Sequence, residues 1–385
     1  MPTFPRVAPH VTAMGGSVYS TLAHRLARFE GEIFPLHIGD TWMEPPQGCW
    51  MEDVSVADHP GMHRYAPVQG LPGLIDAIVD RVSERTGPVE REQVLVTAGA
   101  TGGLGAVMGG ILSPGDEVLL LAPYWPLIAG IVRSMHGVPV AVPFFGEVDN
   151  AEAAVEALQG RRSERTVAVY VNTPNNPTGR VAAPEVLGAV AEWARAHGLY
   201  LVSDEVYEDY QYVGEHTYLR TLAPERTFSA WSFSKGFGMA GNRTGWVVGP
   251  TEQLDQMRKI AVHTFYSTPT ASQIAGERCL RGLGAPWVVK ASSAYNALGS
   301  YAAVRLGLEP PQGSTFLFMD VSPFLDNRGL MGFLSDCVDR GLLLAPGPSF
   351  GPYPTHVRVC FTSAAPQVVR RGVDVLAELI GRSSS

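Results

Sequence analysis

Residues 232–246 read Ser-Phe-Ser-Lys-Gly-Phe-Gly-Met-Ala-Gly-Asn-Arg-Thr-Gly-Trp, and they hold one of only three lysines in a chain of 385 residues. The other 26 of its 29 basic residues are arginines, so the sequence uses arginine wherever a plain positive charge is enough. A neutral amine forms a Schiff base with an aldehyde, whereas a guanidinium stays protonated. Lys235, set among small residues, therefore indicates covalent chemistry. Lys259 and Lys290 are typical of solvated surface lysines.

Strands and helices alternate along the chain from about residue 93. Buried strands are expected at 94–97, 117–121, 139–142, 166–171, 199–203, 227–232 and 246–249, with helices between most of them. This alternation predicts an α/β fold with a mainly parallel sheet of the seven-stranded type, flanked by helices. After about residue 272 the helical stretches are longer, and strands are expected only at 315–321 and 356–361. This change predicts a smaller α+β domain.

The composition excludes several classes of protein. The formal net charge is −8, which argues against a nucleic-acid or acidic-membrane partner. The first eleven residues lack the apolar core of a signal peptide, and apolar runs such as 118–122 are too short to span a bilayer. Four widely spaced cysteines without a CxxC pair predict buried free thiols, with no disulfide and no metal site. A cytoplasmic location fits best.

Unusual residues follow several of the predicted strands, at the edge where open α/β sheets bind ligands. Ala-Gly-Ala-Thr-Gly-Gly at 98–103 opens a helix, whose free N–H groups suit a phosphate. Asn-Thr-Pro-Asn-Asn-Pro-Thr-Gly at 172–179 forms a rigid polar turn, and Asp-Glu-Val-Tyr follows at 204–207. The fourth segment is the lysine segment itself. Together they predict one anion-binding site beside the reactive amine.

In combination and in order, these segments resemble the pyridoxal-phosphate-dependent aminotransferases of fold type I, class I/II, the group that includes aspartate aminotransferase. The resemblance runs from about residue 35 to 361. It implies an N-terminal arm and part of the small domain at 1–45, a large cofactor-binding domain at 46–280, and a small C-terminal domain at 281–385. It also implies transfer of an amino group from an L-amino acid to a 2-oxo acid through a lysine internal aldimine.

The resemblance assigns catalytic roles to three side chains. Lys235 would hold pyridoxal 5′-phosphate and then move a proton between the substrate α-carbon and cofactor C4′. Asp204 would keep the pyridine nitrogen protonated, so that the ring can accept electrons. Tyr207, together with Asn176, would donate hydrogen bonds to the 3′-oxygen of the ring.

Further residues would complete the cofactor site. The phosphate would be held by Ser232, Ser234, Arg243 and the backbone of Gly99, Ala100 and Thr101. Trp125 matches the residue that stacks on one face of the ring, with Val206 on the other. Tyr65 matches a tyrosine that reaches across a homodimer to the partner's phosphate, which implies active sites built from two chains.

The resemblance also implies how the substrate is bound. Arg358 would grip the α-carboxylate with a bidentate fork, beside the backbone of Gly39 and the side chain of Asn176. An arginine between two valines on a strand is costly to bury without a ligand, which supports that role.

Three alternatives remain at this stage. A carbon–sulfur β-lyase would use the same lysine, aspartate and arginine but expel a β-substituent. Residues 96–105 look like the nicotinamide loop of a short-chain dehydrogenase, but no tyrosine has a lysine four residues on, as that family requires. Transcription regulators with this fold carry an additional DNA-binding domain, for which the sequence offers neither room nor basic charge.

The substrate side chain is the least constrained inference. Aspartate-specific bacterial relatives often carry lysine at the position of Thr101, and its absence weakens a dicarboxylate interpretation. A second positive charge could still come from a surface arginine, with candidates at Arg25, Arg28, Arg64 and Arg133. Aromatic candidates for the pocket wall are Tyr19, Trp42 and Phe350. We expect a neutral or aromatic amino acid, with 2-oxoglutarate or pyruvate as the amino acceptor.

Overall fold

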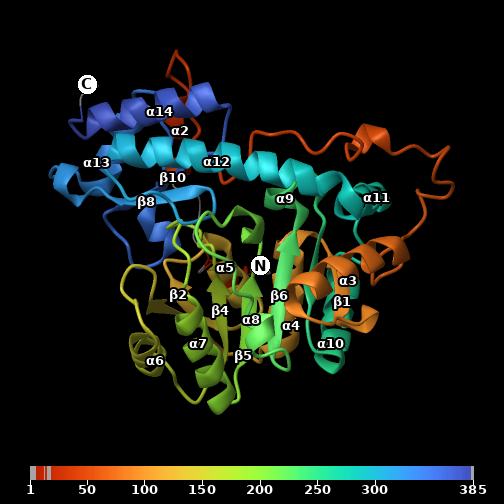
Figure 1. Cartoon of the computed structure of the whole chain (residues 1–385). Coiled ribbons are helices and arrows are strands. Elements are labelled where there is room, and N and C mark those ends of the chain that lie inside the picture. The colour runs from red at the N-terminus through yellow and green to blue at the C-terminus, as the bar shows by residue number, and fades with distance from the viewer. Residues whose placement is uncertain (1–5, 13, 15–18, 383–385) are drawn as a thin grey trace, which may run out of the picture.

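The computed structural model describes residues 6–12, 14 and 19–382. Within these residues, a large sheet flanked by helices forms the lower part of the molecule in Figure 1, and a small sheet with its own helices lies above it. The seven strands of the large sheet are β1 (Val94–Thr97), β2 (Glu117–Ala122), β3 (Val138–Pro143), β4 (Thr166–Asn172), β5 (Tyr200–Asp204), β6 (Thr227–Ser232) and β7 (Gly245–Val248). The α/β class and the second, smaller unit are as the sequence predicts.

The large sheet has the strand order β1-β7-β6-β5-β4-β2-β3. Neighbouring strands run parallel except at β7, which is antiparallel to both β1 and β6. The prediction of a mainly parallel sheet is therefore confirmed. Because β7 runs backwards, its first residue lies level with the last residues of β1 and β6: Gly245 pairs with Thr97 and with Ser232. Residues just before β7 thus reach the same edge as residues just after the other strands.

Both faces of the large sheet are covered, which explains why its strands are almost continuously apolar. Alternate residues point to opposite faces, so that Leu120 packs under one set of helices and Leu119 under another. The first set is α4 (Gly99–Ile111), α5 (Pro126–Ser134) and α10 (Thr251–Thr264). The second is α6 (Ala151–Gln159), α7 (Pro184–Ala196) and α8 (Leu219–Leu222), continued by α3 (Pro72–Thr86) near β1. α9 (Phe233–Gly236) follows β6, and α11 (Thr270–Arg278) leads towards the small unit.

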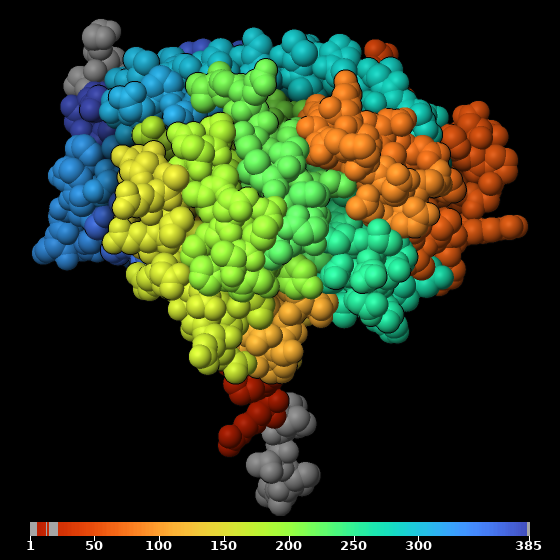
Figure 2. All heavy atoms as spheres, turned by 60° about the horizontal axis from the view of Figure 1, so that its bottom comes forward, coloured from red at the N-terminus to blue at the C-terminus, as the bar shows by residue number. Residues whose placement is uncertain are grey.

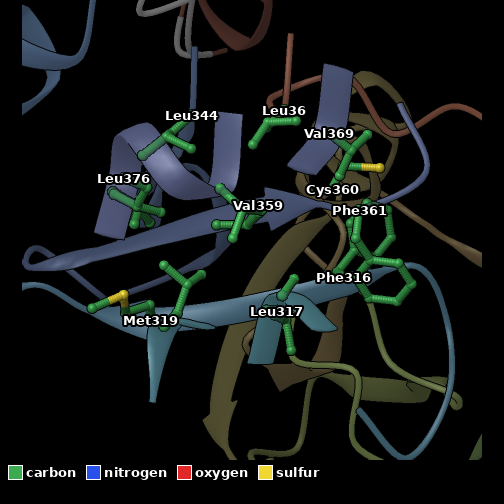
Figure 3. Packing of buried hydrophobic residues seen from close by; sticks show 14 of the residues in the cluster. Leu36, Phe316, Leu317, Met319, Leu344, Val359, Cys360, Phe361, Val369 and Leu376 are labelled. Atoms are coloured by element: carbon green, nitrogen blue, oxygen red, sulfur yellow. The ribbon is translucent and has the colours of Figure 1, made fainter. Parts of the chain in front are cut away.

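The small unit is built on a three-stranded antiparallel sheet in the order β8-β10-β9. Its strands are β8 (Phe316–Asp320), β9 (Ala345–Pro346) and β10 (His356–Cys360), and its helices are α12 (Gly284–Leu306), α13 (Gly329–Val338) and α14 (Pro366–Leu379), with α2 (Tyr19–Leu26) against α13. Leu317, Val359 and Leu376 meet in its core (Figure 3).

Residues near the N-terminus belong to this small core. Phe34 forms a parallel bridge with Leu342, and the backbone N–H of Cys360 donates to the carbonyl oxygen of Leu36 at 2.8 Å. The side chain of Leu36 points into the cluster (Figure 3). The following residues, which include Gly39, are thereby held beside the end of β10.

Two further expectations concern the described residues. All four cysteines are buried and free of disulfides, as predicted. Among the helices of the described part of the chain, none combines the length and the apolar character needed to cross a membrane.

Candidate active site

A cavity of about 230 Å³ lies at the edge of the large sheet where the parallel strands end. Its walls come from the loops after β1, β2, β4, β5 and β6, from the turn before β7, and from the N-terminal segment. The lining residues are Gly39, Ala100, Thr101, Trp125, Asn172, Asn176, Asp204, Val206, Tyr207, Ser232, Ser234, Lys235, Ala240 and Arg243. Most of the residues that the sequence nominates are therefore brought together, from positions more than two hundred residues apart.

One end of the cavity is suited to an anion. Helix α4 begins there at Gly99, whose φ is +66° and where a Cβ would lie only 2.7 Å from Nη2 of Arg243. The Arg243 guanidinium donates to the carbonyl oxygen of Ala240 at 2.8 Å, and the hydroxyls of Ser232 and Ser234 lie 2.8 Å apart. A helix N-terminus, two hydroxyls and a guanidinium thus converge, and together they fit a phosphate group.

The anion end is held rigidly by the start of β7. A Cβ placed on Gly245 would lie 2.4 Å from the carbonyl oxygen of Trp231 and 2.9 Å from the backbone nitrogen of Ala100. No side chain fits between these backbones, so glycine is required there by close approach. The loop at residues 99–100 is consequently packed directly against the antiparallel strand.

Lys235 lies in the middle of the cavity, on α9. Its amine donates a hydrogen bond to the carbonyl oxygen of Gly39 and lies 3.9 Å from Oδ1 of Asp40. Burial lowers the pKa of Lys235, and the nearby Asp40 carboxylate partly opposes that shift. A lowered pKa increases the fraction of neutral amine, which is the form that attacks an aldehyde.

Asp204, the last residue of β5, is a buried carboxylate that lines the cavity. Its Oδ2 accepts a 2.6 Å hydrogen bond from the hydroxyl of Tyr170, while its Oδ1 accepts only a long one, 3.4 Å, from the backbone N–H of Val206. Burial raises the pKa of Asp204 to about 6, against the lowering effect of the Tyr170 bond. Oδ1 retains capacity for another donor, which fits a protonated ring nitrogen.

Two other donors face the same space. The backbone N–H of Asn176 donates to Oδ1 of Asn172 at 2.8 Å, and its side-chain oxygen accepts from Arg358 at 2.9 Å, so its amide NH2 group remains to donate. Burial raises the pKa of Tyr207, against the smaller opposing effects of Arg358 and Asn176, and its phenol stays a donor at neutral pH. Both side chains fit a ring oxygen.

A buried arginine lies at one end of the cavity, next to the lining residues Gly39 and Asn176, although Arg358 is not itself among the lining residues. Arg358 on β10 is 6% exposed and donates from Nη2 to the carbonyl oxygen of His37 at 2.7 Å. Its guanidinium lies over the rings of Phe316, at 4.3 Å, and Phe350, at 4.9 Å. A Cβ on Gly39 would be 3.7 Å from Nη2 of Arg358, so the backbone of residue 39 lies beside the guanidinium. This arrangement suits a carboxylate.

Comparison with known proteins agrees with this geometry. The family model described as "Aminotransferase class I and II" matches residues 34–376. The chain belongs to this family. Its members are pyridoxal-phosphate-dependent, and the aminotransferase chemistry extends to this chain. Phosphate, ring nitrogen, ring oxygen and aldehyde each have a fitting group in the cavity, as described above.

Several named relatives of this aminotransferase cover most of its length. A probable aspartate/prephenate aminotransferase of Thermus aquaticus is 36% identical over 314 residues, 79% of this chain and 80% of its own. An arginine–pyruvate transaminase of Pseudomonas aeruginosa is 30% identical over 96% of this chain and 97% of its own. The structure of Thermus thermophilus aspartate aminotransferase with maleate has a TM-score of 0.87 at 30% identity and covers 98% of this chain and all of that chain. The relatives' names favour transamination over the β-lyase alternative.

Other nominated residues of the aminotransferase lie away from the cavity. Tyr65 is 87% exposed, with its ring 5.1 Å from that of Tyr266. Trp42 packs edge-on against Tyr295, while Tyr19 lies in α2 with a side chain outside the described ones. Among the described cavity-lining residues, none is an arginine of the surface group nominated for a second charge, Arg25, Arg28, Arg64 and Arg133. Arg25 instead pairs with Asp339 at 2.7 Å.

Sequence reasoning missed four residues that the structure places at or beside the site: Tyr170, Asn172, Asp40 and Ala240. Asn172 could have been found, because it ends β4 and opens the turn already singled out. Tyr170 carried a weaker sign, as the one hydroxyl in the apolar run Val-Ala-Val-Tyr-Val. Nothing in the sequence singled out Asp40 or Ala240 except that each stands next to a nominated residue or segment.

Proposed function

We propose that this aminotransferase converts L-amino acids with a neutral or aromatic side chain, with 2-oxoglutarate or pyruvate as the amino acceptor. The charge of the cavity supports this substrate class. Its lining cations, among the described residues, are Lys235 and Arg243, both with cofactor roles, and Arg358 at its end is assigned to the α-carboxylate. Thr101 contributes a hydroxyl where a second carboxylate would need a cation.

In the proposed reaction each residue acts at a defined atom. Bound pyridoxal phosphate supplies an aldehyde and a ring that withdraws electrons from the substrate α-carbon. Arg358, beside Gly39, would fix the α-carboxylate so that the bond to be broken stands perpendicular to the ring. Lys235 would carry the proton between the α-carbon and cofactor C4′, while Asp204 keeps the proton on the ring nitrogen.

The remaining predicted residues would hold the cofactor in place. Ser232, Ser234, Arg243 and the backbone of residues 99–101 would bind the phosphate. Asn176 and Tyr207 would donate to the ring 3′-oxygen, and Trp125 and Val206 would stack on its two faces. The geometry of the cavity supports these roles, which stay predictions.

A homodimer in the cytoplasm is part of the proposal. The segment at about residues 45–66 projects from one side of the body (Figures 1 and 2), and Tyr65 on it lies outside its own chain's cavity. An exposed aromatic residue on a projecting segment is suited to contact a second chain. Sedimentation equilibrium should give twice the mass of one chain. Four buried free thiols fit a reducing compartment.

Single-turnover half-reactions with a panel of amino acids test the substrate proposal. The holoenzyme is mixed with one amino acid at a time, and the loss of cofactor absorbance is followed. We expect neutral or aromatic amino acids to react faster than aspartate and glutamate. Faster reaction with the dicarboxylates would contradict the substrate class, and release of ammonia or sulfide without amine transfer would contradict transamination.

A further inference from the structure

The proposed roles leave the hydroxyl of Tyr170 without a task. Tyr170 is fully buried in β4 and packs in the apolar cluster between the large sheet and helices α4, α5 and α10. Phenylalanine would fill the same space, and a buried hydroxyl is unfavourable unless it is hydrogen-bonded. The Tyr170 hydroxyl donates to Oδ2 of Asp204 at 2.6 Å, within the range of strong hydrogen bonds from a hydroxyl to a carboxylate.

The sheet fixes this contact. Strands β4 and β5 run parallel, with Tyr170 opposite Val202 and Asn172 opposite Asp204. Tyr170 is therefore the diagonal neighbour of Asp204 on one face, at a distance that an aromatic side chain can span. Both residues lie in the central strands, and groups held on strands are more precisely placed than groups on loops.

The groups next to Asp204 bond to other atoms and do not compete with Tyr170 for Oδ2 of Asp204. Glu205, the next carboxylate along the chain, accepts from Ser203 at 2.6 Å and lies 2.7 Å from Nε2 of His216. Asn172 donates to the backbone oxygen of Asp204 at 3.0 Å and so leaves the carboxylate alone. Within the described residues, the second oxygen, Oδ1, accepts the 3.4 Å bond from the backbone N–H of Val206 and no other hydrogen bond.

The chemistry of the pair has a fixed direction. Burial and the adjacent Asp204 carboxylate raise the pKa of Tyr170 well above its usual value, so its proton stays on the phenol and the tyrosine is always the donor. Donation to a carboxylate makes that carboxylate a weaker base. When the Asp204 carboxylate is a weaker base, the proton that it shares with the pyridine nitrogen stays on the nitrogen.

We propose that Tyr170 is a positioning residue for the cofactor: it holds Oδ2 of Asp204, turns Oδ1 towards the pyridine nitrogen and keeps the shared proton on that nitrogen. This inference rests on the proposed role of Asp204. It assigns a task to a residue that touches neither cofactor nor substrate.

The test is Tyr170→Phe, examined as holoenzyme loaded with pyridoxal phosphate labelled with ¹⁵N at the ring. The ¹⁵N chemical shift is expected to move towards that of the neutral pyridine. Because loss of such a supporting hydrogen bond typically costs 10–100-fold in activity, kcat should fall by about that factor with KM changed less than about threefold. Tyr301→Phe is the matched control, because it removes another tyrosine hydroxyl from a carboxylate, Asp374, in the small unit. Tyr301→Phe should change neither the ¹⁵N shift nor kcat.

A second variant guards against a folding defect in the first. Incorporating 3-fluorotyrosine at position 170 keeps the ring and makes the hydroxyl a stronger donor, so the ¹⁵N shift should move in the opposite direction. If the ¹⁵N shift equals that of wild type in both Tyr170 variants but changes in Asp204→Asn, the role of Tyr170 is overturned and that of Asp204 is not. An unaltered shift in Asp204→Asn would instead overturn the proposed role of Asp204.

Discussion

The two ends of the cavity are built differently. The cofactor end comes from loops at one edge of the large sheet, and its ligands lie within a few residues of strand ends. The substrate end combines Gly39, from the N-terminal segment, with Arg358 and Phe350, from the small unit more than three hundred residues later. The first end follows from the topology of one sheet, whereas the second depends on two distant segments meeting. Residues of the two ends should therefore affect different measurements.

The largest effect is expected at the cofactor end, from Lys235→Ala. Loss of the amine would remove both the proposed covalent link and the proposed proton carrier, so kcat should fall by at least about 10⁴-fold. The absorbance band of the enzyme-bound cofactor should change with it. Lys259→Ala, which removes an exposed lysine whose amine donates to Gln256, is the control and should behave as wild type.

At the substrate end, Arg358→Lys should leave the covalent link to the cofactor intact, although Arg358 also donates to Asn176 at 2.9 Å. An ammonium cannot form the bidentate pair, and a buried charge-assisted contact is worth several kcal/mol, so kcat/KM should fall by about 10²–10³-fold. Steady-state kinetics with saturating cofactor measures this. Arg328→Lys, at an exposed pair with Asp326 and Asp336, is the matched control. Loss of the absorbance band of the enzyme-bound cofactor in Arg358→Lys would contradict the separation of the two ends.

A third effect belongs to the cofactor end alone and needs no substrate. Asp204 titrates at 3.8 when unfolded and at about 6 when buried, so the cofactor-free protein gains stability from it below pH 4 and loses that gain as the pH rises to 6. The loss amounts to about 3 kcal/mol in the free energy of unfolding. Urea unfolding between pH 4 and 7 should show this slope in wild type and a flatter one in Asp204→Asn. If the free energy of unfolding has the same slope against pH in wild type and in Asp204→Asn, the raised pKa of Asp204 is refuted.

The smallest effect is expected from a change at the cofactor end that alters the choice of substrate. Thr101→Lys places a cation in the cavity at the phosphate loop, and it should raise kcat/KM for aspartate relative to neutral amino acids by about tenfold, the value of one modest ionic contact. Competition assays with paired amino acids measure the ratio. Thr101→Met, which is similar in length but uncharged, should leave the ratio near that of wild type.

Much of the cofactor end could be predicted because it depends on local patterns. The predicted strand at 199–203 is observed at 200–204, and that at 246–249 is observed at 245–248, so each strand end was placed within about two residues. Ligands next to strand ends then follow from the topology. Arg243 precedes its strand and was nominated as part of the lysine segment, although the sequence does not reveal that β7 runs backwards.

The substrate end could be predicted only in part. Arg358 and its neighbour Phe350 were nominated from the sequence, but the contact with Phe316 and the position of Trp42 depend on packing between distant segments. Strand β9, with two residues and a proline, lacks any recognisable pattern. The role of Tyr170 was not predicted, because the sequence pattern predicts that a strand is buried but does not predict the register of β4 against β5. The division of the chain at residues 45 and 280 stays a prediction.

The close approach at Gly245 also bears on how this enzyme can change over generations. Any side chain there would strike backbone atoms on two sides, so a substitution at position 245 would disturb the phosphate-binding turn. Phe316, on β8, and Phe350, which follows β9, instead pack against Arg358 in the small unit. Descendants of this gene can thus drift towards new amino acids by ordinary point mutations, while they inherit the same coenzyme.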